Sequence, residues 1–226
     1  MRKFVVTAAI AVAALAFVAT AAAASLPANQ SLRYQGAGGH VWNRIGGDSS
    51  HDSDAHALRM KVGDPGAGEY VVAFSKRSLN IARDAEAVTN LSFEFKEMTH
   101  VGAGAPRISV EFQNGDVAYL SASYCNHPMA VTGNEWGRAD FTRFTGNCSF
   151  FVSGETAGPT GQYVADGSRS AWRVYTDAHP DQIVEQAYLV ADESGGYRID
   201  RLSLGAGVMY TSGDRVGKWC TTEASC

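Results

Sequence analysis

The sequence predicts an all-β protein in which two antiparallel sheets pack face to face as a jelly-roll-like sandwich. Three observations lead to this prediction. Short segments alternate apolar and polar residues, which is typical of strands buried on one face. Glycine is frequent, with 24 residues, and recurs between these segments. Almost nothing after residue 24 has helical periodicity. A lectin-like or up-and-down arrangement of the same strands is the alternative.

The first 24 residues have the pattern of a secretory signal peptide. Arg2 and Lys3 precede an apolar stretch at 4–18, and the alanines at 21–24 are small residues that signal peptidase accepts. The stretch is short for a membrane span, and no later segment approaches the roughly 20 apolar residues that a span needs. We therefore expect a signal peptide at 1–24 and a secreted mature chain at 25–226 that forms a single sandwich domain.

The strands follow from the alternation. Segments 91–95 and 107–112 place Leu91, Phe93 and Phe95, and then Ile108, Val110 and Phe112, on one face each. Asn114-Gly115 predicts a hairpin with a type I′ turn that leads into a strand at 117–125. Further strands are expected at 58–62, 69–74, 138–144, 149–152, 171–176, 183–190 and 197–204. Segment 183–190 also fits a short amphipathic helix, and the alternation within 197–204 slips near Asp200-Arg201, which indicates a bulge.

Four cysteines remain in the mature chain, an even number that is typical of disulfides in an exported protein. We expect Cys125–Cys148 to join the end of one strand to the start of another. Cys220–Cys226 would close a small C-terminal tail. Metal binding is the alternative, but no Cys-x-x-Cys pair is present.

Charge argues against two classes of partner. The chain carries a net charge of −4, and its basic runs are no longer than pairs such as Lys76-Arg77. Nucleic acid and anionic lipid surfaces need clustered cations, so neither is an expected partner.

Two segments resemble the jelly-roll, galactose-binding-like carbohydrate-binding modules of secreted glycosidases. Residues 52–62 resemble their early segment, in which a polar loop leads into a strand, although His56-Ala57 stands where those modules often place a glycine. Residues 197–205, Tyr-Arg-Ile-Asp-Arg-Leu-Ser-Leu-Gly, resemble their closing strand. The resemblance implies a sandwich and a structural calcium ion, with Asp200 among its ligands.

The polar loop at 48–56 is the densest candidate for a metal site. Asp48, Asp52 and Asp54 suit calcium, which takes six to eight oxygen ligands at variable geometry. His51 and His56 would suit zinc or copper instead. A solvated loop whose aspartates cap turns is the third interpretation.

Aromatic residues beside polar ones indicate candidate ligand-binding positions. Trp136 lies between Asn134 and Arg138 in an expected loop, and Trp42 lies beside Asn43 and Arg44. Sugars stack on such rings while nearby polar groups bind their hydroxyls, so these four residues (Trp42, Asn134, Trp136 and Arg138) are the candidate ligand-binding set. Tyr119, Tyr124 and Tyr163 supply further rings, whereas Trp172 alternates with Val174 and is expected in the core.

Catalysis has one candidate pair, Glu94 and Glu111, which we expect on neighbouring strands and facing away from the core. Glycosidases use two carboxyl groups about 5 to 9 Å apart. Gly-x-Ser-x-Gly and His-Glu-x-x-His motifs are absent from the sequence. The sequence therefore favours a secreted, non-catalytic protein that binds extracellular polysaccharide. A polysaccharide-cleaving enzyme using Glu94 and Glu111 is the first alternative, and a structural or protein-interaction domain of the cell envelope is the second.

Overall fold

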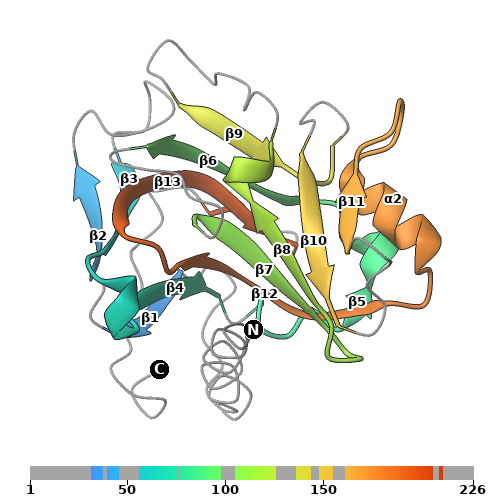
Figure 1. Ribbon diagram of the computed structural model, residues 1–226, viewed down its shortest axis with the longest axis horizontal. Coiled ribbons are helices and arrows are strands. Elements are labelled where there is room, and N and C mark those ends of the chain that lie inside the picture. The colour runs from blue at the N-terminus through green and yellow to red at the C-terminus, as the bar shows by residue number, and fades with distance from the viewer. Residues whose placement is uncertain are drawn as a thin grey trace, which may run out of the picture.

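The computed structural model describes residues 32–37, 40–45, 56–75, 77–97, 105–125, 136–143, 148–154, 161–205 and 209–210. Two antiparallel sheets pack against each other, which confirms the predicted sandwich (Figure 1). The strands, in chain order, are β1 (Arg33–Ala37), β2 (His40–Ile45), β3 (His56–Val62), β4 (Tyr70–Phe74), β5 (Arg83–Asp84), β6 (Leu91–Glu97), β7 (Arg107–Phe112), β8 (Val117–Ser121), β9 (Gly137–Asp140), β10 (Ser149–Ser153), β11 (Gln162–Val164), β12 (Ile183–Ala191), β13 (Gly195–Leu204) and β14 (Met209–Tyr210).

One sheet has eight strands, in the order β1-β4-β12-β7-β8-β10-β11, with β5 also paired to β12. The other has six, in the order β2-β3-β13-β6-β9, with β14 also paired to β13. The late strands β12 and β13 therefore each lie between strands from much earlier in the chain. This interleaving gives the sandwich its jelly-roll-like character.

Alternation sorts the side chains of each strand between the core and the outer face of its sheet. Phe93 and Phe95 of β6 face the shared core, as do Val110 and Phe112 of β7. The intervening residues, such as Glu94, point away from the core. Each sheet therefore has an outer face whose composition is set by every second residue of its strands.

The predicted strand at 171–176 is wrong, because these residues form helix α2 (Ala171–Ala178). The Ser170 hydroxyl caps the helix by accepting the Arg173 N–H at 3.2 Å. Trp172 and Tyr175 then fall on one helical face and pack against Phe112. Trp172 is a core residue, as expected, and its Nε1 donates to the Ala85 carbonyl at 3.0 Å. Figure 1 shows α2 beside β11.

The β7–β8 hairpin is confirmed, but its turn is not type I′. Gly115 N–H donates to the Phe112 carbonyl and Phe112 N–H to the Asp116 carbonyl, so the loop is longer than two residues. Among the described non-glycine residues, only Ala82 and Arg201 have positive φ, so Asn114 does not adopt the left-handed conformation that type I′ requires. Gly115 does, with φ of 88°.

Segment 183–190 lies within strand β12, and the bulge in β13 is confirmed. Pairing of β13 with β6 shifts register between Asp200 and Ser203, and Arg201 has φ of 45°. Because of this extra residue, Asp200 and Arg201 both avoid the core while Ile199 and Leu202 enter it.

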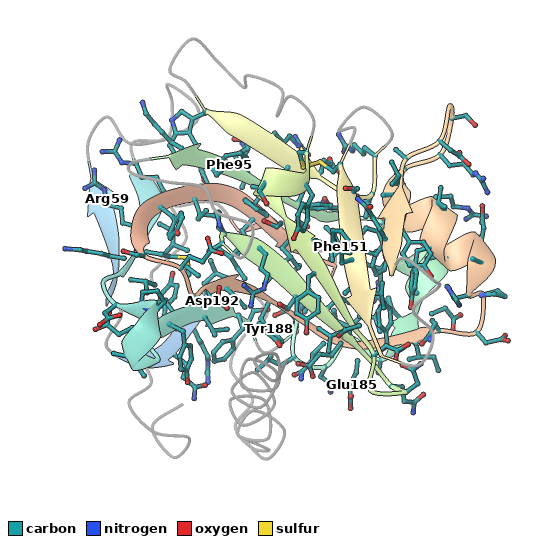
Figure 2. All side chains as sticks on the ribbon, viewed as in Figure 1. Arg59, Phe95, Phe151, Glu185, Tyr188 and Asp192 are labelled. Atoms are coloured by element: carbon teal, nitrogen blue, oxygen red, sulfur yellow. A yellow bond between two sulfur atoms is a disulfide. The ribbon has the colours of Figure 1, made fainter. Side chains whose placement is uncertain are left out.

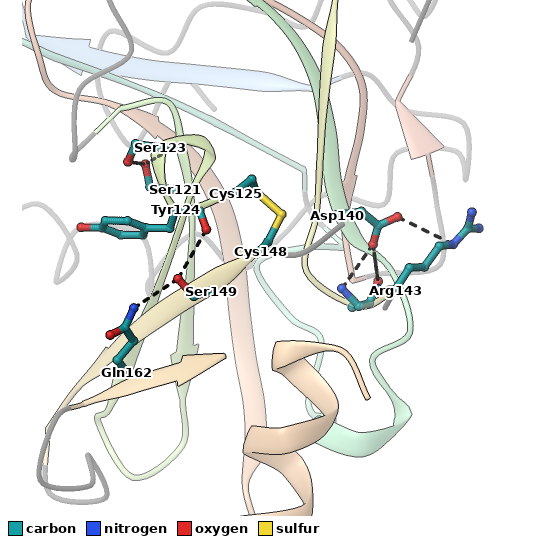
Figure 3. The surroundings of a disulfide bond; sticks show 10 residues. Ser121, Ser123, Tyr124, Cys125, Asp140, Arg143, Cys148, Ser149 and Gln162 are labelled. Carbon is teal, nitrogen blue, oxygen red and sulfur yellow. Dashed lines mark hydrogen bonds and ion pairs between the residues drawn. A yellow bond between two sulfur atoms is a disulfide. The ribbon is translucent and has the colours of Figure 1, made fainter. Parts of the chain in front are cut away.

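The expected disulfide Cys125–Cys148 is present and joins the segment after β8 to the start of β10 (Figure 3). The expected signal peptide at 1–24 and the Cys220–Cys226 pair lie outside the described residues.

Candidate functional site: the outer face of the eight-stranded sheet

Three partly exposed aromatic rings lie together on the outer face of the eight-stranded sheet. Phe150 of β10 enters the core, so Phe151 must point outward, and it pairs in register with Tyr119 of β8. The ring of Tyr124, just after β8, meets Phe151 edge-on with centroids 5.0 Å apart. We call Tyr119, Phe151 and Tyr124 the aromatic platform.

The disulfide holds one edge of this platform in place. Tyr124 immediately precedes Cys125, and Ser149 immediately follows Cys148. The Ser149 hydroxyl donates to the Tyr124 carbonyl at 3.4 Å, as Figure 3 shows. The covalent bond therefore fixes the two segments that present Tyr124 and Phe151.

Polar groups surround the platform on the same face. The Arg107 guanidinium carbon lies 5.7 Å from the centre of the Tyr119 ring, and Arg107 forms a bidentate ion pair with Asp192 at 2.6 and 2.7 Å. The Ser153 hydroxyl donates to the Tyr119 hydroxyl at 3.4 Å. Figure 2 shows Phe151, Tyr188 and Asp192 over the strands of this sheet.

Glu111 occupies the same face of β7, two alternate positions from Arg107. Its carboxyl group accepts a hydrogen bond from the Tyr188 hydroxyl at 2.7 Å and another from the Gln186 amide. Burial raises the pKa of Glu111, an effect that these two hydrogen bonds oppose and the nearby Glu185 reinforces. Burial, together with the Glu111 carboxylate, also raises the pKa of Tyr188. Glu111 is therefore a well-oriented acceptor rather than a freely solvated carboxylate.

Glu94 and Glu111 do not form the predicted catalytic pair. Glu94 lies on β6 of the six-stranded sheet and Glu111 on β7 of the eight-stranded sheet, and both point away from the shared core. The two carboxyl groups therefore face opposite sides of the sandwich. The prediction failed because consecutive strands were assumed to be neighbours, whereas here the chain crosses from one sheet to the other between them.

Three predicted site residues do meet, on the outer face of the six-stranded sheet. Asp200, Glu94 and Arg138 occupy one cross-strand row on β13, β6 and β9. Arg138 pairs with Asp140 at 3.1 Å and approaches Glu94 at 4.0 Å, and Arg201 also approaches Glu94 at 4.0 Å. Arg138 is thus engaged with carboxylates of its own sheet.

Trp136 is not the exposed loop ring that was predicted. It immediately precedes β9 and is only 2% exposed, so it offers no face to a sugar. Trp42 lies on β2, and its backbone pairs with Arg59, but its side chain is outside the description. Asn134, Asp48, Asp52 and Asp54 also lie outside the described residues.

The aromatic platform itself was only partly foreseen. Tyr119 and Tyr124 were recognised as available rings, but Phe151 was missed. The signal was the pair Phe150-Phe151, because adjacent residues of a strand point to opposite faces and one of two consecutive phenylalanines must therefore face outward.

No family model, curated protein or solved structure matches this chain. Within the described part of the chain, no cluster of three or more His, Cys, Asp or Glu side chains could hold a metal ion. In the same part, no helix has the length and apolar character needed to cross a membrane. The calcium site stays a prediction, since three of its four expected ligands lie outside the described residues.

Proposed function

We propose that this protein is secreted and binds polysaccharide, without cleaving it, through the aromatic platform. The observation that carries the proposal is the side-by-side placement of Tyr119 and Phe151, partly exposed and in register, on a sheet face that also bears oriented polar groups. Isolated aromatic residues on a protein surface are common, whereas a row of them with hydrogen-bonding groups alongside is typical of ligand sites.

The chemistry of the face suits an uncharged sugar. A pyranose ring has apolar C–H faces, which pack on aromatic rings, and hydroxyl groups at its rim, which need donors and acceptors. Glu111 and Asp192 supply carboxylate acceptors, and Arg107 supplies donors. Because Arg107 and Asp192 neutralise each other, the platform has no excess positive charge that would select an acidic ligand. We therefore infer that its ligand is a neutral glycan.

Binding to a panel of insoluble neutral polysaccharides, measured by depletion from solution, tests this function. Tyr119→Ala and Phe151→Ala should each weaken binding by about tenfold, which corresponds to about 1.4 kcal/mol. This is comparable to the free energy that an aromatic contact and the burial of its surface contribute. Tyr70→Ala is the matched control, because Tyr70 is a partly exposed tyrosine on β4, three strands away from β8. Equal binding by all four proteins, or binding by none, would refute the proposal.

Secretion is supported by the pattern of residues 1–24 and by a disulfide that an oxidising compartment would maintain. Expression of the full chain in a bacterium with an intact export pathway, followed by N-terminal sequencing, tests it. We expect the protein outside the cytoplasmic membrane with a new N-terminus near Ser25. Retention of Met1 on cytoplasmic protein would contradict export.

A further inference from the structure

The carboxyl group of Glu111 lies beside the aromatic platform on the outer face of the eight-stranded sheet. Tyr119 of β8 pairs in register with Ser109, two positions before Glu111 on β7, so Glu111 and Tyr119 are diagonal neighbours on adjacent strands. The Cα atoms of such neighbours lie about 7 to 8 Å apart. A sugar ring that stacks on Tyr119 therefore brings the hydroxyl groups of its rim within reach of Glu111.

The protein donors that the described structure gives this carboxyl group both come from β12. Oε1 of Glu111 accepts a hydrogen bond from the Tyr188 hydroxyl at 2.7 Å, and Oε2 accepts one from the Gln186 amide. Strand β12 pairs with β7 on the side away from β8. On the β8 side, the register partner of Glu111 is Val117, whose side chain has no donor. The two donors therefore fix the carboxyl group from one side, and its other side faces the platform.

Both oxygens of Glu111 have capacity for a further hydrogen bond. A carboxylate can accept about four hydrogen bonds, two on each oxygen. Within the described part of the chain, each oxygen of Glu111 accepts one. Glu111 is also partly exposed, so a ligand can reach the remaining positions. Two adjacent hydroxyl groups of a sugar match this arrangement, because each can donate to one oxygen.

A carboxylate at this position lowers the stability of the fold. Burial disfavours the charged form of Glu111 and raises its pKa, and the charge of Glu185 adds to the effect. A glutamine would fill nearly the same space without this cost. Ionisable groups that are kept in an unfavourable environment concentrate at functional sites, where their chemistry offsets the lost stability.

We propose that the ionised carboxylate of Glu111 binds a pair of adjacent free hydroxyl groups on the neutral glycan, and that ligand binding is thereby coupled to the release of a proton. This inference rests on the proposed function, because it concerns the same site. It narrows the ligand to glycans whose neighbouring hydroxyl groups are unsubstituted, since an acceptor that loses its donor in the complex costs affinity. It also makes the affinity depend on pH.

The sign of this pH dependence follows from the charge of Glu111. Hydrogen bonds to an ionised acceptor are stronger than those to a neutral one, so protonation of Glu111 weakens the complex. Affinity is therefore complete at neutral pH and falls as the solution becomes acidic. Because the pKa of Glu111 is raised in the folded protein, the fall begins at a higher pH than for a solvated glutamate. By linkage, a ligand that prefers the ionised form lowers this pKa when it binds.

Other ionisable groups surround this carboxyl group. Tyr188 and Glu185 belong to β12, Tyr119 to β8 and Arg107 to β7 itself, and Asp192, just after β12, is paired with Arg107. The raised pKa of Tyr188 keeps its hydroxyl a donor throughout the acid range, and Arg107 stays charged. Two of these groups act on the pKa of the carboxyl group: the hydrogen bond from Tyr188 lowers it and the charge of Glu185 raises it.

Depletion binding of the full-length protein at several pH values tests the proposal with three insoluble neutral probes. Amorphous cellulose and mannan have adjacent free hydroxyl groups at C2 and C3, whereas chitin has an acetamido group at C2. We expect binding to cellulose or mannan that falls about tenfold between about pH 7 and about pH 4, and weaker binding to chitin. Absence of binding to every probe at every pH would overturn this inference together with the function on which it rests. Binding that does not change with pH, or that is tightest on chitin, would overturn this inference alone.

Glu111→Gln keeps the shape of the side chain but cannot ionise. It should weaken binding about tenfold at pH 7 and leave an affinity that no longer changes with pH. The same variant should be more stable than the wild type at pH 7, so its loss of affinity cannot come from damage to the fold. Glu86→Gln is the matched control, because Glu86 is an exposed glutamate on η2 (Ala85–Ala87), where it pairs with Arg173 of α2. The control should bind as the wild type does at every pH, and a pH dependence that persists in Glu111→Gln would overturn the proposal.

Two further variants should move the midpoint of the pH profile in opposite directions. Tyr188→Phe removes a donor that favours the carboxylate, so the pKa of Glu111 and the midpoint should rise. Glu185→Gln removes a nearby negative charge, so both should fall while the affinity at pH 7 is retained. Unchanged midpoints, or shifts of the opposite sign, would show that another group titrates and would overturn the proposal.

Discussion

Removal of the disulfide by the double substitution Cys125→Ala and Cys148→Ala should destabilise the protein by about 3.4 kcal/mol. The bond closes a loop with a sequence separation of 23 residues. In the chain-entropy model, a cross-link of that span lowers the entropy of the unfolded chain by an amount worth about 3.4 kcal/mol at 25 °C. For a protein of about 200 residues, this corresponds to a decrease in melting temperature of about 10 °C.

Guanidinium denaturation at 25 °C, followed by tryptophan fluorescence, measures this difference. Reductant should lower the stability of the wild-type protein by a similar amount. Reductant should have a much smaller effect on the stability of the double variant. Comparison of the reductant effects on the wild-type protein and the variant therefore separates the contribution of Cys125–Cys148 from that of any bond between Cys220 and Cys226. A loss below about 1 kcal/mol in the variant, or an equal effect of reductant on both proteins, would refute the reasoning.

Two substitutions test local features of the eight-stranded sheet. Glu111→Gln should increase the free energy of unfolding at pH 7, because a carboxyl group whose pKa is raised in the folded state favours folding only while it stays protonated. In denaturation curves below about pH 4, the gain over wild type should vanish. A gain that persists there would argue against ionisation of Glu111 as its cause. Gly154→Ala should cost about 2 to 4 kcal/mol, because Gly154 has φ of 124° and an added Cβ would lie 1.8 Å from Oδ1 of the buried Asp116. Gly68→Ala, at φ of 80° in open space, should lose less stability by thermal denaturation, and an equal loss would remove the steric argument.

Alternation predicted the strands whose two faces differ most in environment. Segments 91–95 and 107–112 have one face in the core and one outside, so their pattern in the sequence is regular and both strands are confirmed. The bulge in β13 was predictable for the same reason. An inserted residue moves the apolar side chains from the odd-numbered to the even-numbered positions of the strand. The short strands β5 and β11 have too few residues to show a pattern.

Two other errors have identifiable physical causes. Trp172 and Val174 alternate as in a strand, but the Ser170 cap and the burial of Tyr175 favour a helix, and tertiary packing decides between the two. Asn114-Gly115 is compatible with more than one hairpin turn, and the sequence does not specify whether one or both of its residues adopt positive φ.

The candidate sites were harder to predict than the strands, because register between distant strands determines which side chains become neighbours. Arg59 and Lys96 meet Arg198 only because β13 inserts between β3 and β6, and no local pattern in any of the three segments indicates that insertion. In the other sheet, the pairing of β10 with β8 places Phe151 beside Tyr119, and these two strands are also separated along the chain. In a sandwich of this kind, the surface chemistry that selects a ligand is a property of the strand order.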